Sequence, residues 1–357
     1  QYIILENKFG WLDKLVGRAT YGINGNVAKL NGPFLIVKDD NYNNSITNEN
    51  QSYIQSPPNP SLRWERTAVN NFAIDFNLFK NRFSGSVEYY SKNTTDLLGN
   101  FSLDPTLGWT SLLMNFGSMY NRGVELTLSS VNIDNKNFKW TSGLVFGYNK
   151  NEITKVESGS ESALDYYYGT NIRKGYPMDA LFSIRYAGLD LDGLPKAYKK
   201  DGTITKNYDE LTKEDLVYSG TINPPYNASL TNSFSYKGFD LSFMLVYYGG
   251  NVMRDVRAGS VMSTHPVYYS SNRDKEFLNY WKKPGDELDP NTNPAFLFGN
   301  PLNSSAKYIW GAADKHIQKG DYIKLRDLTL GYTLPSKLLK NYFIQSLRVN
   351  VQIQNLW

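Results

Sequence analysis

Three carboxylates, Asp75, Glu88 and Glu125, stand at polar positions of segments in which apolar and polar residues alternate. Successive side chains of a β-strand point to opposite faces, so each carboxylate shares its face with other polar groups. There it could accept hydrogen bonds from a polar substrate. A solvated polar face would hold the same residues without any ligand, so both roles stay open.

Aromatic side chains in the connecting segments are candidates for contacts with a saccharide. Trp109 and the run Tyr166, Tyr167 and Tyr168 carry rings that could stack on the apolar faces of sugars. Such rings also collect at membrane boundaries and inside packed loops, where they need no ligand. Loop packing and ligand stacking are therefore two interpretations of these four residues.

Two arginines could hold an anion. Arg254 and Arg257 flank Asp255 just beyond the alternating run at 239–249. A guanidinium group suits either an anionic substrate or a lipopolysaccharide phosphate. An ordinary salt bridge is the alternative interpretation.

Metal binding and catalysis find little support. Asp190 and Asp192 precede Gly193 as at the start of a calcium loop, but the later ligand positions are missing, which favours a plain turn. His265 and His316 are the only histidines, and the sequence has no H-E-x-x-H, G-x-S-x-G or G-x-x-x-x-G-K-[ST] motif. We expect neither a cofactor nor an enzyme activity.

The elements that must position these residues are β-strands. Residues 72–93 alternate apolar and polar side chains, turn at 79–81 and alternate again, which predicts a β-hairpin. In 138–148 the apolar face begins with Phe138 and Trp140 and ends with Tyr148, so aromatic rings mark both of its ends. A soluble sandwich or a membrane barrel would accommodate such strands.

Composition narrows that choice. The chain has 357 residues, of which 15% are aromatic, and its mean hydropathy is −0.47. No apolar run approaches the roughly 18 residues of a transmembrane helix, so any membrane crossing must use strands. The net charge of +4 is dispersed, which argues against a nucleic-acid partner, and the lack of cysteine excludes disulfides. Without an initiator methionine or a signal peptide, the chain is expected to be a piece of a longer protein.

The links between the alternating runs fall into two length classes. Strands are predicted near 15–24, 64–78, 82–93, 112–130, 138–150, 225–236, 239–249, 320–334 and 345–357. Short links lie between them at 79–81, 131–137, 237–238 and 335–344, and long loops near 25–63, 94–111, 151–224 and 250–319. Bacterial outer-membrane barrels have short periplasmic turns and long extracellular loops. We therefore predict an all-β fold, a partial transmembrane antiparallel β-barrel, with a β-bulge near Arg326 and Asp327 where one run changes phase.

Six segments, in order along the chain, carry a family resemblance. They are GRATYGINGN at 17–26, NPSLRWERT at 59–67, RFSGSVEYYSKNTTDLL at 82–98, NFGSMYNRGVELTL at 115–128, YIKLRDLTLGYTLP at 322–335 and QNLW at 354–357. Together they resemble the C-terminal half of the SusC/RagA-type TonB-dependent outer-membrane transporters of Bacteroidetes. Ser61 and Arg66 depart from residues common in that family without changing the assignment.

The resemblance implies a barrel of about 22 strands with an N-terminal plug that lies outside residues 1–357. It implies import of oligosaccharides or oligopeptides across the outer membrane, driven by TonB acting on the absent N-terminal region. A SusD-like surface lipoprotein is the implied partner, in a SusCD dimer or a larger complex, and outer-membrane lipid and lipopolysaccharide are the implied surroundings. A structural or docking subunit of a larger outer-membrane assembly is the alternative, and a soluble carbohydrate-binding protein is a third hypothesis.

Overall fold

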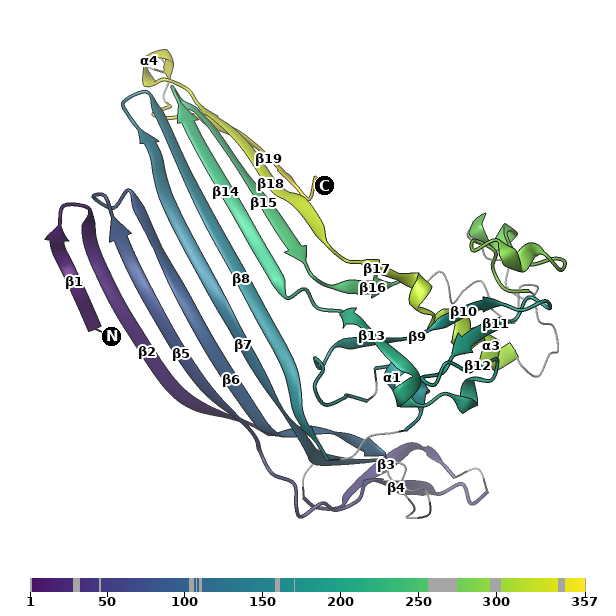
Figure 1. The fold of residues 1–357 in the computed structure, drawn as a ribbon. Coiled ribbons are helices and arrows are strands. Elements are labelled where there is room, and N and C mark those ends of the chain that lie inside the picture. Colours follow the sequence, from purple (N-terminus) through teal and green to yellow (C-terminus); the bar gives the residue numbers. More distant parts are fainter. Residues whose placement is uncertain are drawn as a thin grey trace.

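A single ten-stranded antiparallel sheet forms most of the molecule (Figure 1). The computed structural model describes residues 2–27, 33–44, 46–102, 106, 108, 111–157, 161–169, 171–255, 275–295, 303–339 and 344–356. The strands, in their order across the sheet, are β1 (Tyr2–Phe9), β2 (Leu12–Asn26), β5 (Glu65–Leu78), β6 (Phe83–Ser102), β7 (Ser111–Asp134), β8 (Phe138–Val156), β14 (Tyr226–Tyr236), β15 (Phe239–Gly249), β18 (Tyr322–Thr333) and β19 (Arg348–Gln354). Each strand pairs with the next strand of the sheet along the chain, which is the topology of an up-and-down barrel wall.

The alternation of side chains gives this wall one apolar and one polar face. Phe72 and Ile74 are 54% and 50% exposed on the apolar face, whereas Ala73 between them is buried on the polar face. Across the β5–β6 pair, Phe72 lies opposite Tyr89 and Ile74 opposite Val87, so the apolar face continues into the next strand. The hairpin predicted over 72–93 is confirmed.

Aromatic side chains form two rows across the apolar face. The first, the rim row, comprises the register neighbours Phe72, Tyr89, Tyr148 and Tyr226, with Val124 between the second and third. The second, the turn row, comprises Phe138, Tyr236, Phe239 and Tyr332. The rows are ten residues apart in β8, which corresponds to about 24 Å across a membrane for strands tilted by about 45°. An outer-membrane barrel has an apolar band of about 25 Å between its two aromatic girdles.

Two strand predictions need correction. The first predicted run, 15–24, is the middle of the longer strand β2, and β1 precedes it across a turn at Gly10 and Trp11. The consecutive apolar residues at 3–5 conceal the alternation of β1. The loop predicted near 94–111 is mostly strand, because β6 continues to Ser102 and β7 begins at Ser111.

The bulge predicted in β18 is confirmed. Met244 of β15 pairs with Asp327, and the next residue, Leu245, pairs with Leu325, so Arg326 is the extra residue of β18. The bulge returns Leu325 to the apolar face that Leu328 occupies on its other side. The change of phase in the sequence is therefore a feature that keeps the apolar face continuous.

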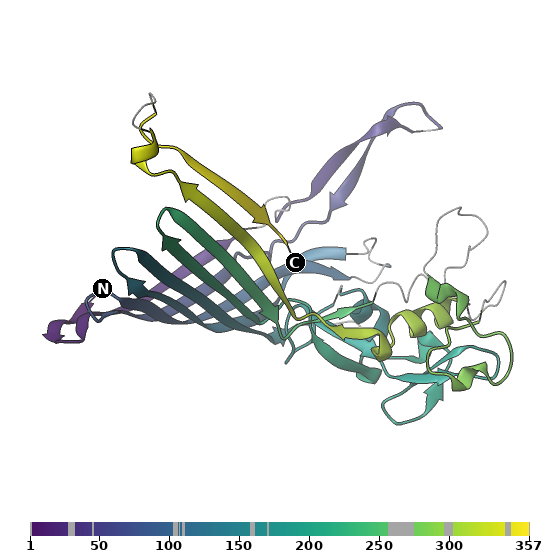
Figure 2. The same ribbon diagram turned by 90° about the horizontal axis from the view of Figure 1, so that it is seen from above.

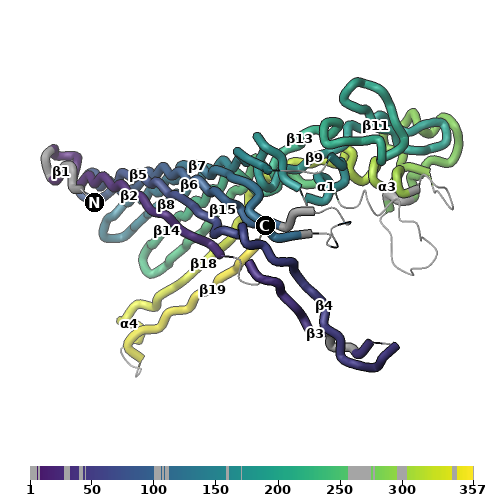
Figure 3. Tube along the Cα trace, turned by 90° about the horizontal axis from the view of Figure 1, so that it is seen from below, coloured from purple at the N-terminus to yellow at the C-terminus, as the bar shows by residue number. Residues whose placement is uncertain are grey.

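The connections at the two ends of the sheet differ in length. Short turns lie at one end, and the large insertions lie at the other (Figure 1). The link after β2 forms a hairpin of β3 (Ile36–Asn43) and β4 (Asn50–Ser56). Figures 2 and 3 show this hairpin projecting away from the other insertions.

The described residues of 157–225 and 250–321 fold together, and we call them the rim domain. Its strands are β9 (Ala180–Ile184), β10 (Tyr186–Leu189), β11 (Pro195–Tyr198), β12 (Ile204–Thr205), β13 (Leu216–Thr221), β16 (Val252–Arg254) and β17 (Ile317–Lys319). Its helices are α1 (Ala163–Tyr167) and α3 (Asn303–Gly311). Phe182 and Ile184 of the first link and Ile309 of the second share one buried cluster. The two long links therefore build one core.

One further helix, α4 (Ser336–Leu339), lies in the turn before β19. Within the described part of the chain, no helix has both the length and the apolar character needed to cross a membrane.

Candidate functional site

The polar face carries a charged cluster on neighbouring strands. Arg18 of β2 binds Asp75 of β5 through two contacts, Nε to Oδ2 at 2.6 Å and Nη2 to Oδ1 at 2.9 Å. The same guanidinium lies 3.8 Å from an Oε2 atom of Glu88 on β6. Asn71 donates a hydrogen bond of 2.5 Å to the other oxygen of Glu88. Both carboxylates are thus held in fixed positions.

The third predicted carboxylate, Glu125, extends this cluster to β7. It lies directly opposite Glu88 in the β6–β7 register. Among the described residues, no hydrogen bond or ion pair reaches the Glu125 carboxylate, and its side chain is exposed. Like charges placed opposite each other are unfavourable. Glu125 is therefore the member of the cluster that is free to meet a cation or a hydroxyl group from outside the chain.

A tyrosine closes one side of this region. Tyr90 of β6 lies across Gly123 of β7, where a Cβ atom would overlap the Tyr90 ring. Its hydroxyl donates a 3.0 Å hydrogen bond to Oδ1 of Asn149 on β8. The ring therefore needs the glycine beneath it to lie flat against the wall.

The aromatic candidates lie in different surroundings. Tyr166 is buried in the core of the rim domain, where its ring packs edge-to-face against Phe182 at 6.0 Å. Tyr167 packs against Tyr168 with ring centroids 5.0 Å apart. Tyr168 is 58% exposed and is the one ring of this run that is open to a ligand. Trp109 lies outside the described residues.

Arg254 is placed inside the rim domain. Its Nη2 donates a 2.5 Å hydrogen bond to the carbonyl oxygen of Phe182, and its guanidinium lies 4.6 Å from the Tyr167 ring centroid. Burial lowers the pKa of Arg254. These contacts hold its guanidinium against the core of the rim domain. Arg257, the second predicted anion-binding arginine, lies outside the described residues.

Asp190 forms a turn, as the sequence favours. Its Oδ1 accepts the backbone N–H groups of Asp192 and Leu194, and its Oδ2 accepts Nζ of Lys206 at 2.8 Å. Burial alone would raise the pKa of Asp190, but these hydrogen bonds lower it below the usual value. No cluster of three or more potential metal-binding side chains occurs among the residues with described positions.

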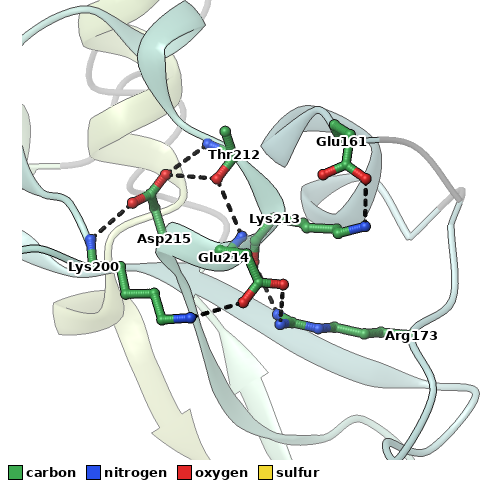
Figure 4. A network of polar contacts seen from close by, with 7 residues as sticks. All are labelled: Glu161, Arg173, Lys200, Thr212, Lys213, Glu214 and Asp215. Carbon is green, nitrogen blue, oxygen red and sulfur yellow. Dashed lines mark hydrogen bonds and ion pairs between the residues drawn. The ribbon is translucent and has the colours of Figure 1, made fainter.

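An ionic network holds the rim domain together (Figure 4). Glu214 binds Lys200 at 3.1 Å and Arg173 at 2.7 Å, and the adjacent Lys213 binds Glu161 at 2.6 Å. The hydrogen bond from Lys200 and the charge of Arg173 lower the pKa of Glu214. The network joins the beginning, middle and end of the link between β8 and β14.

A cleft of about 860 Å³ lies where β8 meets the rim domain. Its lining includes Asn149 and Asn151 of the wall and Tyr176, Tyr218 and Asp179 of the rim domain. Amide groups and ring faces of this kind suit polar ligands with apolar faces, such as sugars or peptides. Three of these groups already have partners within the chain. Asp179 accepts hydrogen bonds from Thr221 and Asn223, and the Oδ1 atoms of Asn149 and Asn151 accept hydrogen bonds from Tyr90 and Met178.

Comparison with known proteins agrees with this architecture. A TonB-dependent receptor of Formosa agariphila is 28% identical over 98% of this chain, and a second receptor of that organism is 26% identical over 95%. SusC of Bacteroides thetaiotaomicron is 28% identical over 77% of the chain. The solved structure of the RagAB peptide transporter superposes on 98% of the chain with a TM-score of 0.77 at 25% identity. The chain is similar in sequence to TonB-dependent receptors, SusC among them, and in fold to the RagAB transporter. No protein-family model matches it.

The relationship fixes the fold class and the location. The ten-stranded sheet is part of a transmembrane antiparallel β-barrel of the outer membrane. The chain spans 37% and 34% of the two Formosa agariphila receptors and 38% of the RagAB chain. The chain therefore corresponds in length to about a third of such a protein.

The sequence missed two parts of the site. Arg18 lies in the GRATYG segment, and the alternation of β2 could have placed it on the polar face, but pairing with Asp75 depends on strand register. The cleft could not be predicted, since Tyr176 and Tyr218 meet the wall only after the rim domain has folded.

Proposed function

We propose that the full-length protein is a TonB-dependent importer of oligosaccharides or oligopeptides that works with a SusD-like lipoprotein in the outer membrane. The observation that carries this proposal is the superposition of nearly the whole chain on the RagAB peptide transporter. The sequence relationship to SusC supports it. Because the relatives are named receptors and transporters, we infer transport rather than catalysis.

The polar face supplies surfaces suited to a substrate on the inner side of the wall. The three carboxylates Asp75, Glu88 and Glu125 outnumber the two nearby cations, Arg18 and Lys14, so this part of the wall carries a small excess of negative charge. Such a surface favours substrates with hydroxyl or cationic groups over anions. The cleft at the rim adds amide and ring contacts farther out.

The β3–β4 hairpin offers a surface to a protein partner. It carries Val37, Tyr53 and Ile54 with about half of each side chain exposed, and Ile46 at its tip is 91% exposed. Exposed apolar side chains gathered on one projecting element are typical of protein-protein contacts. We assign this hairpin and the rim domain to contacts with the lipoprotein.

The test is a native pull-down of the full-length protein from outer membranes, with mass spectrometry of proteins and small ligands. Recovery of a SusD-like lipoprotein with a bound glycan or peptide is the expected result, and it would identify the substrate class. Uptake of that ligand should fall in Glu125→Gln and stay normal in Asp134→Asn, a control that removes one exposed negative charge at the short turn between β7 and β8. Stable recovery with assembly machinery, without a ligand and without an uptake defect on gene deletion, would instead support a docking subunit.

A further inference from the structure

The apolar face of the wall ends in two cations placed side by side. Arg122 of β7 lies directly opposite Lys150 of β8 in the strand register, and both side chains are exposed. They occupy the register row immediately beyond Val124 and Tyr148 of the rim row. Like charges directly opposite one another destabilise a sheet, so a bound anion would stabilise this pair.

The chain's own anion beside the pair, Glu152, makes a direct contact with only one of the two cations, Lys150, and the charge of Arg122 acts on it from farther away. Glu152 binds Lys150 at 3.0 Å and accepts the hydroxyl of Tyr120 at 2.5 Å. The Arg122 guanidinium lies over the Tyr120 ring, 4.3 Å from its centroid. Within the described ranges it makes no hydrogen bond or ion pair, so its fork of N–H donors is available to an oxyanion.

The height of the pair on the wall indicates which anion it meets. The pair lies two positions farther along its strands than the rim row, which is about 5 Å along the membrane normal for a tilted strand. Aromatic girdles lie at the headgroup level of a bilayer. Below the pair, Tyr148 stacks on Tyr226 with centroids 5.0 Å apart and provides an apolar surface. A lipid whose acyl chains lie along that surface brings its headgroup to the two cations.

We propose that Arg122 and Lys150 bind a phosphate group of an outer-leaflet glycolipid. Guanidinium and ammonium groups together suit a phosphate better than a carboxylate, because three oxygens are available to them. The proposal differs from the sequence-based candidates for such a phosphate, Arg254 and Arg257. Arg254 binds the carbonyl oxygen of Phe182 inside the rim domain, and Arg257 lies outside the described residues. It rests on the outward orientation of the rim that the proposed function also uses, but it requires no transported substrate.

The chain provides a matched control. Lys92 of β6 lies over the ring of Tyr90, 4.9 Å from its centroid, as Arg122 lies over Tyr120. Lys92 pairs with Asn121, next to Arg122 in β7, so both cations have nearly the same height. Lys92 belongs to the polar face, where no lipid reaches.

The experiment is native mass spectrometry of the full-length protein in micelles containing lipid A with two phosphates. We expect lipid occupancy to fall about tenfold in Arg122→Gln/Lys150→Gln, to persist in Lys92→Gln, and to recover partly in Arg122→Lys/Lys150→Gln. Wild-type protein should bind dephosphorylated lipid A about tenfold less well, a comparison that needs no variant. Equal binding of both lipids, or equal occupancy in the double variant, would overturn the proposal. Complete displacement of the lipid by millimolar inorganic phosphate would assign the pair to free phosphate instead. None of these outcomes depends on uptake, so they are separate from a failure of the proposed function.

Discussion

On the polar face, the lack of a side chain at a glycine can matter as much as the side chain of its neighbour. Tyr90 reaches Asn149 only because Gly123 has no side chain beneath the ring. Gly143, on the same face of the next strand, has open space above it, with only the carbonyl oxygen of Leu128 at 3.9 Å. The sequence pattern does not distinguish these two glycines, but only Gly123 lies under a ring that leaves no room for a side chain.

We predict that Gly123→Val destabilises the wall by about 1–3 kcal/mol, because the new side chain overlaps the Tyr90 ring and the backbone of β8. Folding of the full-length protein is measured by its heat-modifiable migration in gels and by the denaturant midpoint. Gly143→Val is the control and should fold almost normally. If both variants lost the same stability, the close approach at Gly123 would not be the cause.

A partly buried histidine gives the rim domain a pH dependence. His316 packs edge-to-face on Trp310, with centroids 4.6 Å apart, and burial lowers its pKa to about 4. The neighbouring Lys315 and Arg254 act in the same direction, whereas Asp255 opposes them. Because the unfolded histidine titrates near pH 6.5, the unfolded rim domain binds more protons between about pH 6.5 and 4, and its stability must fall as the pH falls through that window.

Hydrogen exchange of peptides from 303–319, corrected for intrinsic rates, should therefore show less protection at pH 5 than at pH 7. In His316→Gln this component of the pH dependence should disappear, because the amide does not titrate. Unchanged loss of protection in the variant would assign the effect to other groups.

The residue-scale predictions from sequence succeed where alternation alone decides. Alternation places Asp75, Glu88 and Glu125 on one face, and the fold brings them together with Arg18. It says nothing of Tyr166, whose burial depends on a core assembled from segments far apart in the chain.

At the scale of elements, bulges decide how far a strand can be recognised. In β18 the extra residue Arg326 shifts the alternation once, and the change of phase is visible in the sequence. In β6 the register shifts near Leu97, and Asp96 has a left-handed backbone with φ of 57°. The alternation ends there in the sequence, so the sequence alone predicts a loop for the outer third of β6.

We predict that deletion of Arg326 is tolerated. Without it, Leu325 and Leu328 are separated by Asp327 alone, so simple alternation replaces the bulge and both stay on the apolar face. Deletion of Thr329 is the control, because it moves the following apolar residues of β18 to the polar face. Assembly into the outer membrane should be close to normal in the first variant and strongly reduced in the second. Equal assembly would mean that register is not what limits folding of this strand.

At the scale of the whole molecule, the rim domain is fastened to the barrel. Backbone hydrogen bonds form a junction between β8 and the rim domain. The Ile153 N–H donates to the carbonyl oxygen of Tyr176, and the Gly175 N–H donates to the carbonyl oxygen of Ile153, each at 2.8 Å. Met178 N–H donates a 2.6 Å hydrogen bond to Oδ1 of Asn151. The domain therefore continues the sheet and should move with it.

Locking this junction should leave uptake intact. The chain has no cysteine, so Asn151→Cys and Met178→Cys can be joined by a disulfide or a short bis-maleimide in the full-length protein. Because Asn151 and Met178 line the cleft, uptake of the ligand identified by pull-down is compared in the double-cysteine variant before and after cross-linking. We expect the two rates to be equal, because the rim domain continues the sheet and moves with it. Loss of uptake on cross-linking, reversed by reduction and absent in the single-cysteine variants, would make the rim domain itself the moving part.

The spacing of the two aromatic rows has a consequence for the surrounding bilayer. A wall about 24 Å tall is shorter than the hydrocarbon core of about 30 Å of an average bilayer, and the bacterial outer membrane is thinner than that average. In a bilayer of average thickness the lipids next to the barrel would have to compress to meet it, at a cost of a fraction of a kcal/mol per Å of mismatch. The height of the wall therefore favours the thinner outer membrane over thicker bilayers.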